Sequence, residues 1–343
     1  MKQIVECVPN FSEGRDKSVI DQIGESVKSV EGVKLLSLEP DKDYNRTVVT
    51  LVGEPKSVVE AAFRATKKAT EFIDMRQHKG EHPRLGATDV VPFIPISGVT
   101  MDDCVQLANM YGERVAKELK IPVYLYEFAA RSPQRRNLAD IRKGEYEGLQ
   151  EKLKDAAWKP DYGAAEFNAK SGATVTGARK FLIAYNVNLN TPDQSIANEI
   201  GGRIRESGKP QKDAAGKVVK DGKGETVRIP GTLKAVKAMG VFLERFNIVQ
   251  VSINLVDFET TNMHQAFEEV KKQARTFGCD ATGSEVVGLV PLEAVLSSGR
   301  FYAEKQGKKN SSEKELVELA VQQLGLSQLE TFRPEKKIIE YQL

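Results

Sequence analysis

The stretch at residues 78–95 reads HKGEHPRLGATDVVPFIP and joins two elements of different kinds. Before it, apolar residues recur every three or four positions, which predicts an amphipathic helix. The apolar run at residues 90–96 predicts a strand, whereas the connection between the two is rich in glycine, proline and charge. Two of the three histidines of the chain, His78 and His82, lie in this connection. Histidine changes its charge near neutral pH, so we expect the chemistry of the protein here.

The two histidines allow three interpretations. Residues 78–82 match H-x-x-E-H, a zinc-protease motif whose histidines share one face of a helix. Gly80 lies between them and Pro83 follows the second, and both residues disfavour a helix. We therefore expect an extended backbone at His82 and no zinc site. A polar surface loop without function and a catalytic His82 both stay open at this point, and we favour the catalytic histidine.

The composition indicates an ordinary globular protein. The 343 residues are 40% hydrophobic and 29% charged, and 50 basic residues stand against 48 acidic ones. This balance gives no reason to expect binding to nucleic acid or to a membrane. No apolar run reaches the ~18 residues of a membrane span, and the first residues lack the apolar core of a secretion signal. We expect a cytoplasmic protein.

The cysteines and the acidic turn residues do not predict a metal site. Cys7, Cys104 and Cys279 are few, odd in number and widely spaced, which fits reduced and mostly buried thiols. Asp41 and Asp43 have no third oxygen ligand nearby, so they indicate a turn.

The first half of the chain predicts the element order β-α-β-β-α-β, which is that of the split, ferredoxin-like unit. We expect strands at residues 3–9, 33–38, 46–53 and 90–96, and helices at residues 16–30 and 55–73. A helix at residues 100–119 follows, with Thr100 and Asp103 as a capping box. A short strand at 123–126 comes next, and residues 131–154 are basic at first and then helical.

The second half repeats this order. We expect strands at residues 180–187, 236–242, 249–256 and 284–291, and helices at residues 192–206 and 263–277. Residues 208–224 form a solvated, mobile insertion. A helix at 312–324 and an apolar strand at 338–343 end the sequence.

The predicted fold class is therefore α+β, an α/β sandwich of two ferredoxin-like subdomains. We place these subdomains at residues 1–178 and 179–328, with a tail at 329–343 that packs back. Two such halves facing one another leave a cleft, where ligand sites often lie.

The segment DYGAAEFNAKSG at residues 161–172 has neither a helix nor a strand period. Its glycines allow the backbone to approach a partner closely. It contains no G-x-G-x-x-G and no Walker spacing, so nothing here supports nucleotide binding. An interdomain linker is the alternative interpretation.

Other charged residues are weaker candidates. Arg46, at the start of a strand, is placed to clamp a carboxylate. Arg131, Arg135 and Arg136 fit either a solvated basic loop or an anion-binding cleft. His264, at the start of a helix, is a structural or surface residue more readily than a catalyst.

Seven short blocks of sequence along the chain are similar to those of a known protein family. They are VECVPNFSEG at 5–14, NRTV at 45–48, KGEHPR at 79–84, DVVPFIP at 89–95, GATVTGARKFLI at 172–183, VGLVP at 287–291 and IIEY at 338–341. Together they resemble the glutamate formimidoyltransferase family, the transferase part of formimidoyltransferase-cyclodeaminase. That family's fold is two α/β subdomains of ferredoxin-like type, in agreement with the doubled pattern.

The resemblance implies transfer of a formimino group from N-formimino-L-glutamate to tetrahydrofolate, late in histidine breakdown. Tetrahydrofolate, with or without a polyglutamate tail, would be a co-substrate, and neither a metal nor a bound cofactor would be needed. The resemblance also implies at least a homodimer. Cyclodeaminase activity is not expected, because the chain stops where the transferase part stops. Glu39 departs from the Asp of the family's pattern, which leaves its role open, and the 208–224 loop is longer than the family's.

The site residues follow from the resemblance and from the charges of the substrates. His82 matches the catalytic histidine and would carry a proton from one nitrogen to another, with Asp89 or Glu81 fixing its tautomer. The folate-contacting segment falls on Gly163, Ala164, Ala165, Glu166, Phe167, Asn168, Ala169, Lys170, Ser171 and Gly172. For the substrate carboxylates we expect Arg46, Lys79, Arg84, Arg179 or Lys180.

Two alternative functions stay open. One is formyl transfer between 5-formyltetrahydrofolate and glutamate at the same site. A formyl group differs from a formimino group by one oxygen in place of one nitrogen, and the sequence does not distinguish the two reactions. A folate-binding module without catalysis is the alternative from another class.

Overall fold

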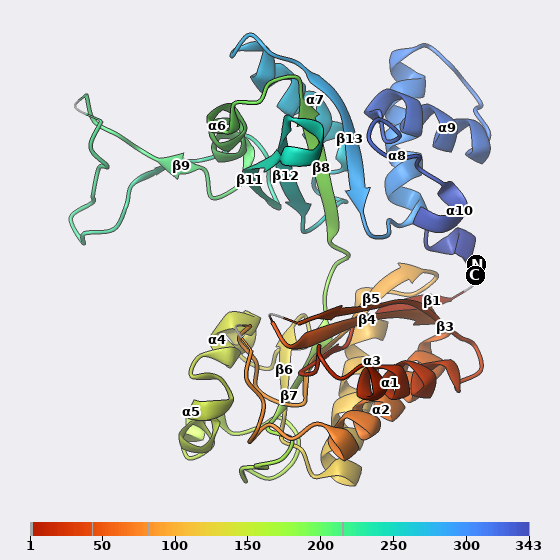
Figure 1. The fold of residues 1–343 in the computed structure, drawn as a ribbon, viewed down its shortest axis with the longest axis vertical. Coiled ribbons are helices and arrows are strands. Elements are labelled where there is room, and N and C mark those ends of the chain that lie inside the picture. The colour runs from red at the N-terminus through yellow and green to blue at the C-terminus, as the bar shows by residue number, and fades with distance from the viewer. Residues whose placement is uncertain (1–2, 43, 81, 215, 343) are drawn as a thin grey trace. The chain divides into compact units, whose positions relative to one another are not determined.

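The computed structural model describes residues 3–42, 44–80, 82–214 and 216–342 (Figure 1). The chain divides into two compact units, Met1–Lys180 and Phe181–Leu343. Each unit contains both helices and strands, with the helices packed on one main β-sheet.

The sheet of the first unit is built from seven strands. They are β1 (Ile4–Cys7), β2 (Asn10–Phe11), β3 (Val33–Asp41), β4 (Arg46–Gly53), β5 (Thr88–Ser97), β6 (Val123–Glu127) and β7 (Thr174–Ala178). β1 and β2 both pair antiparallel with β4 on one side and with β5 on the other, so they share one strand position. β3 pairs with β4, and β7 lies parallel between β5 and β6. The start of β5 thereby lies beside the start of β7.

Helices pack on this sheet and enclose two apolar cores against it. The larger core lies under α1 (Lys17–Lys28), α2 (Pro55–Phe72) and α3 (Met101–Arg114), which continues in a π-turn at Val115–Leu119. The smaller core joins β6 and β7 to α4 (Leu138–Arg142) and α5 (Glu145–Lys152). Short 3₁₀ turns at Pro133–Arg135 and Ala156–Trp158 flank these two helices. The predicted capping box is confirmed, because Thr100 accepts a hydrogen bond from the N–H of Asp103 and the Asp103 carboxylate accepts one from the N–H of Thr100.

The second unit has a four-stranded antiparallel sheet in the order β11-β12-β8-β13. Its strands are β8 (Ile183–Leu189), β11 (Val236–Leu243), β12 (Ile248–Leu255) and β13 (Ala281–Val287), and a 3₁₀ turn at Glu244–Phe246 joins β11 to β12. Its helices are α6 (Gln194–Ile204), α7 (Met263–Arg275), α8 (Leu292–Lys305), α9 (Glu313–Leu324) and α10 (Pro334–Lys337), followed by a 3₁₀ turn at Glu340–Gln342. Both units thus contain the predicted order β-α-β-β-α-β.

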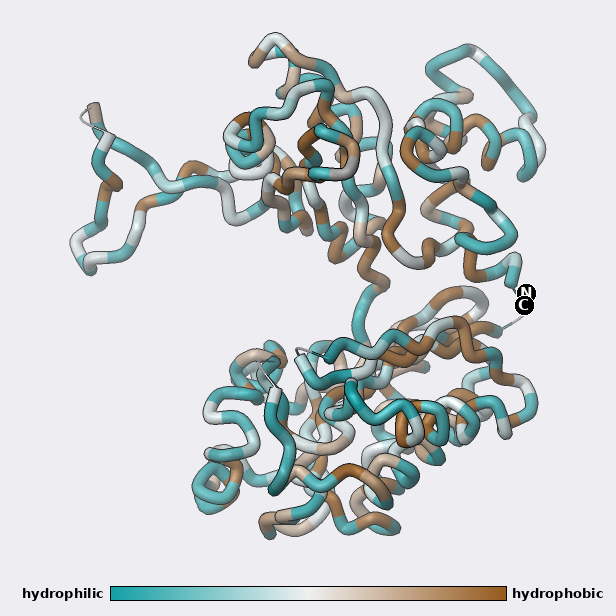
Figure 2. The backbone as a smooth tube through the Cα atoms, viewed as in Figure 1, coloured by the Kyte–Doolittle hydropathy of each residue, from teal (hydrophilic) through white to brown (hydrophobic). Residues whose placement is uncertain are grey.

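The insertion at residues 208–230 is a polar arm of the second unit. It contains the short strands β9 (Lys209–Pro210) and β10 (Arg228–Ile229) and two tight turns that begin at Asp213 and Asp221. Figure 2 colours most of it teal and white, in keeping with its polar composition.

Three details of the prediction need correction. Residues 338–343 were expected to form a strand, but Ile338 makes only an isolated bridge to Val290 before the final 3₁₀ turn. The apolar pattern that suggested a strand reflects the burial of Ile338 and Ile339, which are both fully buried outside the sheet. Strand β7 and helix α8 were not predicted at all.

None of the helices in the described part of the chain is long and apolar enough to cross a membrane.

Candidate active site

A turn between β3 and β4 supports the loop that carries the first two histidines. Asn45 adopts the left-handed backbone conformation in this turn, with a φ of 47°. Its side-chain oxygen accepts a hydrogen bond from the N–H of Gly14 (2.9 Å), and its amide nitrogen donates to the carbonyl oxygen of Lys79 (3.0 Å). A Cβ atom at Gly80 would lie 2.2 Å from the carbonyl oxygen of Tyr44. Glycine at position 80 therefore allows the loop to pack directly on the turn.

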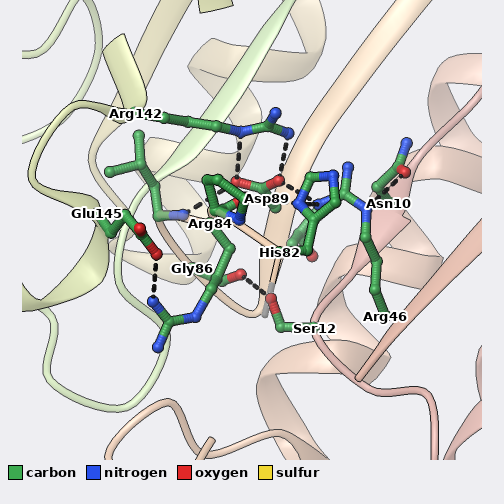
Figure 3. Close-up of polar contacts among 12 residues, drawn as sticks. Asn10, Ser12, Arg46, His82, Arg84, Gly86, Asp89, Arg142 and Glu145 are labelled. Carbon is green, nitrogen blue, oxygen red and sulfur yellow. Dashed lines mark hydrogen bonds and ion pairs between the residues drawn. The ribbon is translucent and has the colours of Figure 1, made fainter. Parts of the chain in front are cut away.

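Asp89 is the centre of a polar cluster at the start of β5 (Figure 3). Its side chain is 0% exposed. Oδ2 accepts hydrogen bonds from Nη1 of Arg46 (2.6 Å) and Nη2 of Arg142 (2.5 Å), and Oδ1 accepts one from the N–H of Leu85 (2.9 Å). Burial alone would raise the pKa of Asp89, but the two guanidinium groups and these hydrogen bonds hold it below its ordinary value. Asp89 is thus a buried anion shared by two arginines.

The imidazole of His82 lies beside Arg46. Its Nδ1 is 2.8 Å from the carbonyl oxygen of Pro83 and 3.3 Å from Nη1 of Arg46. A carbonyl only accepts and a guanidinium only donates, so Nδ1 forms a hydrogen bond with one of them at a time. The shorter contact assigns the proton to Nδ1, which donates to Pro83. Nε2 then carries the lone pair, and no residue in the described ranges hydrogen-bonds to it.

The surroundings of His82 favour its neutral form. Partial burial, followed by the positive charge of Arg46, lowers the pKa of His82, although the hydrogen bond to Pro83 acts in the opposite direction. An imidazole with a lowered pKa is deprotonated at neutral pH, so Nε2 is available as a base.

His78 is held differently from His82. Its Nε2 donates to the carbonyl oxygen of Asn45 (2.9 Å), and its Nδ1 accepts from Nε of Arg84 (3.3 Å). Burial is the main cause that lowers the pKa of His78. Because both ring nitrogens have protein partners, His78 fixes the loop, whereas His82 offers a nitrogen to a ligand. Across the described ranges, no group of three His, Cys, Asp or Glu side chains is placed to hold a metal ion.

Arg84 was expected to bind a substrate carboxylate, but the structure places it in ion pairs with the protein. Its Nη1 donates to Glu145 (2.8 Å) and its Nη2 donates to Glu147 (2.7 Å). The hydrogen bonds from Arg84 to Glu147 are the main cause that raises the pKa of Arg84. Arg84 thus ties the histidine loop to the start of α5.

Lys79 and Arg179 lie in different surroundings. Lys79 is exposed and lines an open pocket of about 700 Å³ together with Gly80, Arg84 and Tyr146. Arg179 follows β7, and its N–H donates to the carbonyl oxygen of Phe93 (3.2 Å), four residues along β5 from Asp89. Its Nη1 donates to the carbonyl oxygen of Lys180 (3.1 Å), and its guanidinium acts on Tyr126, where it opposes the rise that burial causes in the pKa of that phenol.

The segment at residues 163–172 is exposed in its first part and anchored in its second. Residues 163–166 are exposed, whereas Ser171 and Gly172 are buried. Ser171 accepts a hydrogen bond at its carbonyl oxygen from the N–H of Ala87 (2.9 Å), and Gly172 forms a bridge to Gly86 in the histidine loop. The ring of Phe167 packs 5.4 Å from that of Tyr146. The segment is therefore not a free linker, because its second part is fastened to the histidine loop.

The expected partners of His82 need one correction. Asp89 was expected to hold the imidazole directly, but its hydrogen bonds go to Arg46, Arg142 and Leu85, and it influences the ring through Arg46. Glu81, the other candidate, lies outside the described residues. The carbonyl oxygen of Pro83 takes the expected place of the carboxylate.

Two members of the cluster, Arg142 and Asn10, are not among the residues that the sequence predicts for the site. Arg142 lies in the stretch predicted to be basic and then helical, and Asn10 lies in the block at residues 5–14. Asn10 accepts a hydrogen bond from Nε of Arg46 (3.0 Å).

In the second unit, the ring of His264 stacks on that of Phe301 with 4.5 Å between the ring centres, and burial lowers the pKa of His264 to about 4. His264 is thus a buried residue and not a surface one, and its structural role stays a prediction.

Comparisons with known proteins cover nearly the whole chain. The model described as "Formiminotransferase domain, N-terminal subdomain" matches residues 4–179, and the model "Formiminotransferase domain" matches residues 184–343. The "Formimidoyltransferase-cyclodeaminase" of Rattus norvegicus is 48% identical over 342 residues, which are 99% of this chain and 60% of the relative. This chain therefore spans less than two thirds of that relative's length.

Shorter relatives match along nearly their full length. The "Glutamate formimidoyltransferase" of Streptococcus pyogenes serotype M1 is 45% identical over 88% of this chain and 94% of the relative. That of Thermoplasma acidophilum is 44% identical over 89% of this chain and 93% of the relative. With both halves matched by the family's models and these relatives so similar, the chain belongs to the formiminotransferase domain family.

Proposed function

We propose that this protein transfers the formimino group of N-formimino-L-glutamate to tetrahydrofolate, giving 5-formiminotetrahydrofolate and L-glutamate in histidine degradation. Nitrogen N5 of the pteridine attacks the formimino carbon and a tetrahedral intermediate forms. The bond from that carbon to the glutamate nitrogen then breaks. The observation that carries the proposal is the imidazole of His82, whose Nε2 has no hydrogen-bond partner in the described chain, beside a buried cluster with two arginines.

His82 accounts for the proton balance of this reaction. Its Nε2 removes the proton from N5 as the new bond forms, and the imidazolium then delivers a proton to the departing glutamate nitrogen. Arg46 lies 3.3 Å from Nδ1, and its positive charge makes the imidazolium a stronger acid. Positioned acid–base catalysis of this kind contributes about 10²–10⁴ in rate.

Arg46 is the best-supported residue for binding a substrate carboxylate. Arg46 and Arg142 carry two positive charges and Asp89 one negative charge, so the three groups leave one positive charge in excess. Since these side chains are 10%, 13% and 0% exposed, that charge is poorly solvated and attracts an anion. Lys79, exposed at the pocket beside the loop, is the second candidate. The protein partners of Arg84 make it a weaker candidate, and Arg179 stays a candidate from the sequence.

We further propose that residues 163–172 contact the folate. The exposed backbone of residues 163–166 and the anchored Phe167 support this, because a flat pteridine or benzoyl ring stacks on aromatic and peptide surfaces. Tetrahydrofolate would thus lie beside the histidine loop, to which the end of the segment is fastened.

The remaining proposals are structural. The sheet orders β3-β4-β1/β2-β5 and β11-β12-β8-β13 support two ferredoxin-like subdomains at residues 1–178 and 179–328, with 329–343 as a tail. The substrate cleft between the halves, the homodimer and the cytoplasmic location stay predictions from the sequence and from the family.

The proposal is tested by incubating the purified protein with tetrahydrofolate and formiminoglutamate and measuring 5-formiminotetrahydrofolate by mass spectrometry. A parallel reaction contains 5-formyltetrahydrofolate and glutamate. We expect formimino transfer to be the faster reaction. Formyl transfer alone would replace the proposed donor, whereas folate binding with no transfer of either group would favour the binding module.

A further inference from the structure

We propose that Arg142 is a positioning residue for the transfer reaction, acting on His82 through Asp89 and Arg46. This inference rests on the proposed function, in which His82 is the proton carrier. Arg142 makes no hydrogen bond to His82 among the interactions of the described residues, so it positions the ring through the other two side chains, while its charge acts on the ring across space.

The contacts form a continuous series (Figure 3). Arg142 uses two nitrogens on Asp89, with Nη2 2.5 Å from Oδ2 and Nε 3.4 Å from Oδ1. The same Oδ2 accepts from Nη1 of Arg46 (2.6 Å), and this Nη1 lies 3.3 Å from Nδ1 of His82. The carboxylate of Asp89 thus joins two guanidinium groups that would otherwise repel each other, and it fixes where Arg46 lies.

Arg142 also sets the charge that His82 experiences. With two arginines on Asp89, the carboxylate is more than neutralised and the imidazole faces a net positive group. Without Arg142, Asp89 and Arg46 would neutralise each other, and the net positive charge beside the ring would disappear. Because a positive neighbour disfavours the imidazolium, its loss raises the pKa of His82.

The position of Arg142 is itself fixed by the protein. It is the last residue of α4, and α5 begins three residues later at Glu145. Glu145 and Glu147 pair with Arg84 in the histidine loop, and the N–H of Tyr146 donates to the carbonyl oxygen of Arg84 (2.9 Å). The α4–α5 junction therefore contacts the histidine loop at Arg84 and the start of β5 at Asp89, which suits a part that places a catalytic side chain.

Three variants of the full chain separate positioning from general stability. Arg142→Met removes the positive charge and both hydrogen bonds to Asp89, while Arg142→Lys keeps the charge but cannot form the bidentate pair of hydrogen bonds. Arg114→Met is the matched control, since Arg114, the last residue of α3, pairs with Glu60 of α2 and with Glu118 of the π-turn that follows α3. The readouts are kcat, KM for both substrates, and NMR titration of the three histidine rings, which requires no turnover.

For Arg142→Met we expect kcat to fall about 10²-fold, as for a misplaced catalytic group. The KM of the substrate whose carboxylate Arg46 binds should rise as well, because the excess positive charge of the cluster is lost. The pKa of His82 rises by about one unit. Arg142→Lys keeps the wild-type pKa and recovers part of kcat, and Arg114→Met changes neither quantity.

Two results would overturn the inference. In one, Arg142→Met has the wild-type kcat and histidine titration. In the other, Arg142→Met and Arg114→Met lose activity equally with no change in the pKa of His82, which would make Arg142 merely structural. If the wild type transfers no formimino group, the proposed function fails separately, and the NMR titration still decides whether Arg142 acts on His82.

Discussion

Asp89→Asn is the substitution that most sharply tests how the site is held together. The two side chains have nearly the same shape, so the change removes one charge and little volume. Asp89 is 0% exposed and bonds two guanidinium groups and the N–H of Leu85. Breaking a buried ion pair on one side costs about 3–5 kcal/mol, because the remaining charge stays buried without its partner. We expect a loss of stability in this range at pH 7.

The effect depends on pH in a definite direction. The pKa of Asp89 is lower in the folded protein than in the unfolded chain. The stability that it contributes is therefore fully present above the unfolded pKa of ~3.9 and is lost as the pH falls through the lower, folded value. The difference between wild type and Asp89→Asn is thus constant near neutrality and shrinks below about pH 4.

The assay is urea unfolding followed by tryptophan fluorescence. Trp158 is the only tryptophan of the chain and lies in the first unit, where Tyr124 donates a hydrogen bond to its carbonyl oxygen (2.7 Å). With a slope of about 3 kcal/mol per M of urea, a loss of 3–5 kcal/mol lowers the midpoint by about 1 M or more.

The control is Asp21→Asn, because Asp21 is exposed and its ion pair among the described residues is with Lys17, one turn earlier in α1. We expect no measurable change in the midpoint for this variant. If Asp89→Asn also unfolds at the wild-type midpoint at pH 7, Asp89 does not bind the two arginines as described, and the reasoning on the site is refuted.

Further predictions concern the loop and its histidines. Burial and Arg46 lower the pKa of His82, so kcat/KM should stay constant as the pH falls from 8 to below the ordinary histidine pKa of ~6.5. If kcat/KM already declines on lowering the pH from above 7, this prediction is contradicted. Gly80→Ala should lower kcat about tenfold or more, since its Cβ would lie 2.2 Å from the carbonyl oxygen of Tyr44 and displace the loop. Gly222→Ala, which adds a Cβ in open space, is its control, and an equal effect of both would refute the role of the loop.

Much of the fold was predictable because its signals are local. Apolar spacing and capping residues mark helices such as α3 within a few positions of sequence. β7 was missed because its sequence, TVTGA, is short and contains Gly177. It becomes a strand by pairing with β5 and β6, and Gly177 is needed there because a Cβ would lie 2.3 Å from the carbonyl oxygen of Tyr126. Neither requirement is visible in the local pattern.

The site was predictable in part for the same reason. His82 stands out by residue type and by its glycine- and proline-shaped loop, and Asp89 and Arg46 lie in blocks that resemble the family. Arg142 lies in a charged stretch that is typical of a solvated surface, and its partner is 53 residues away in sequence. Only the long-range contact between α4 and the start of β5 shows that this charge is buried.

The central claim is that His82 carries the proton in formimino transfer. The most direct measurement compares kcat with formiminoglutamate and tetrahydrofolate for wild type and His82→Ala, with His264→Gln as a control for loss of a buried imidazole. We predict turnover by the wild type, a loss of about 10²-fold or more in kcat for His82→Ala with folate binding kept, and little change in kcat for His264→Gln. A His82→Ala protein within a few-fold of wild type would contradict the claim and leave the loop with only a structural role.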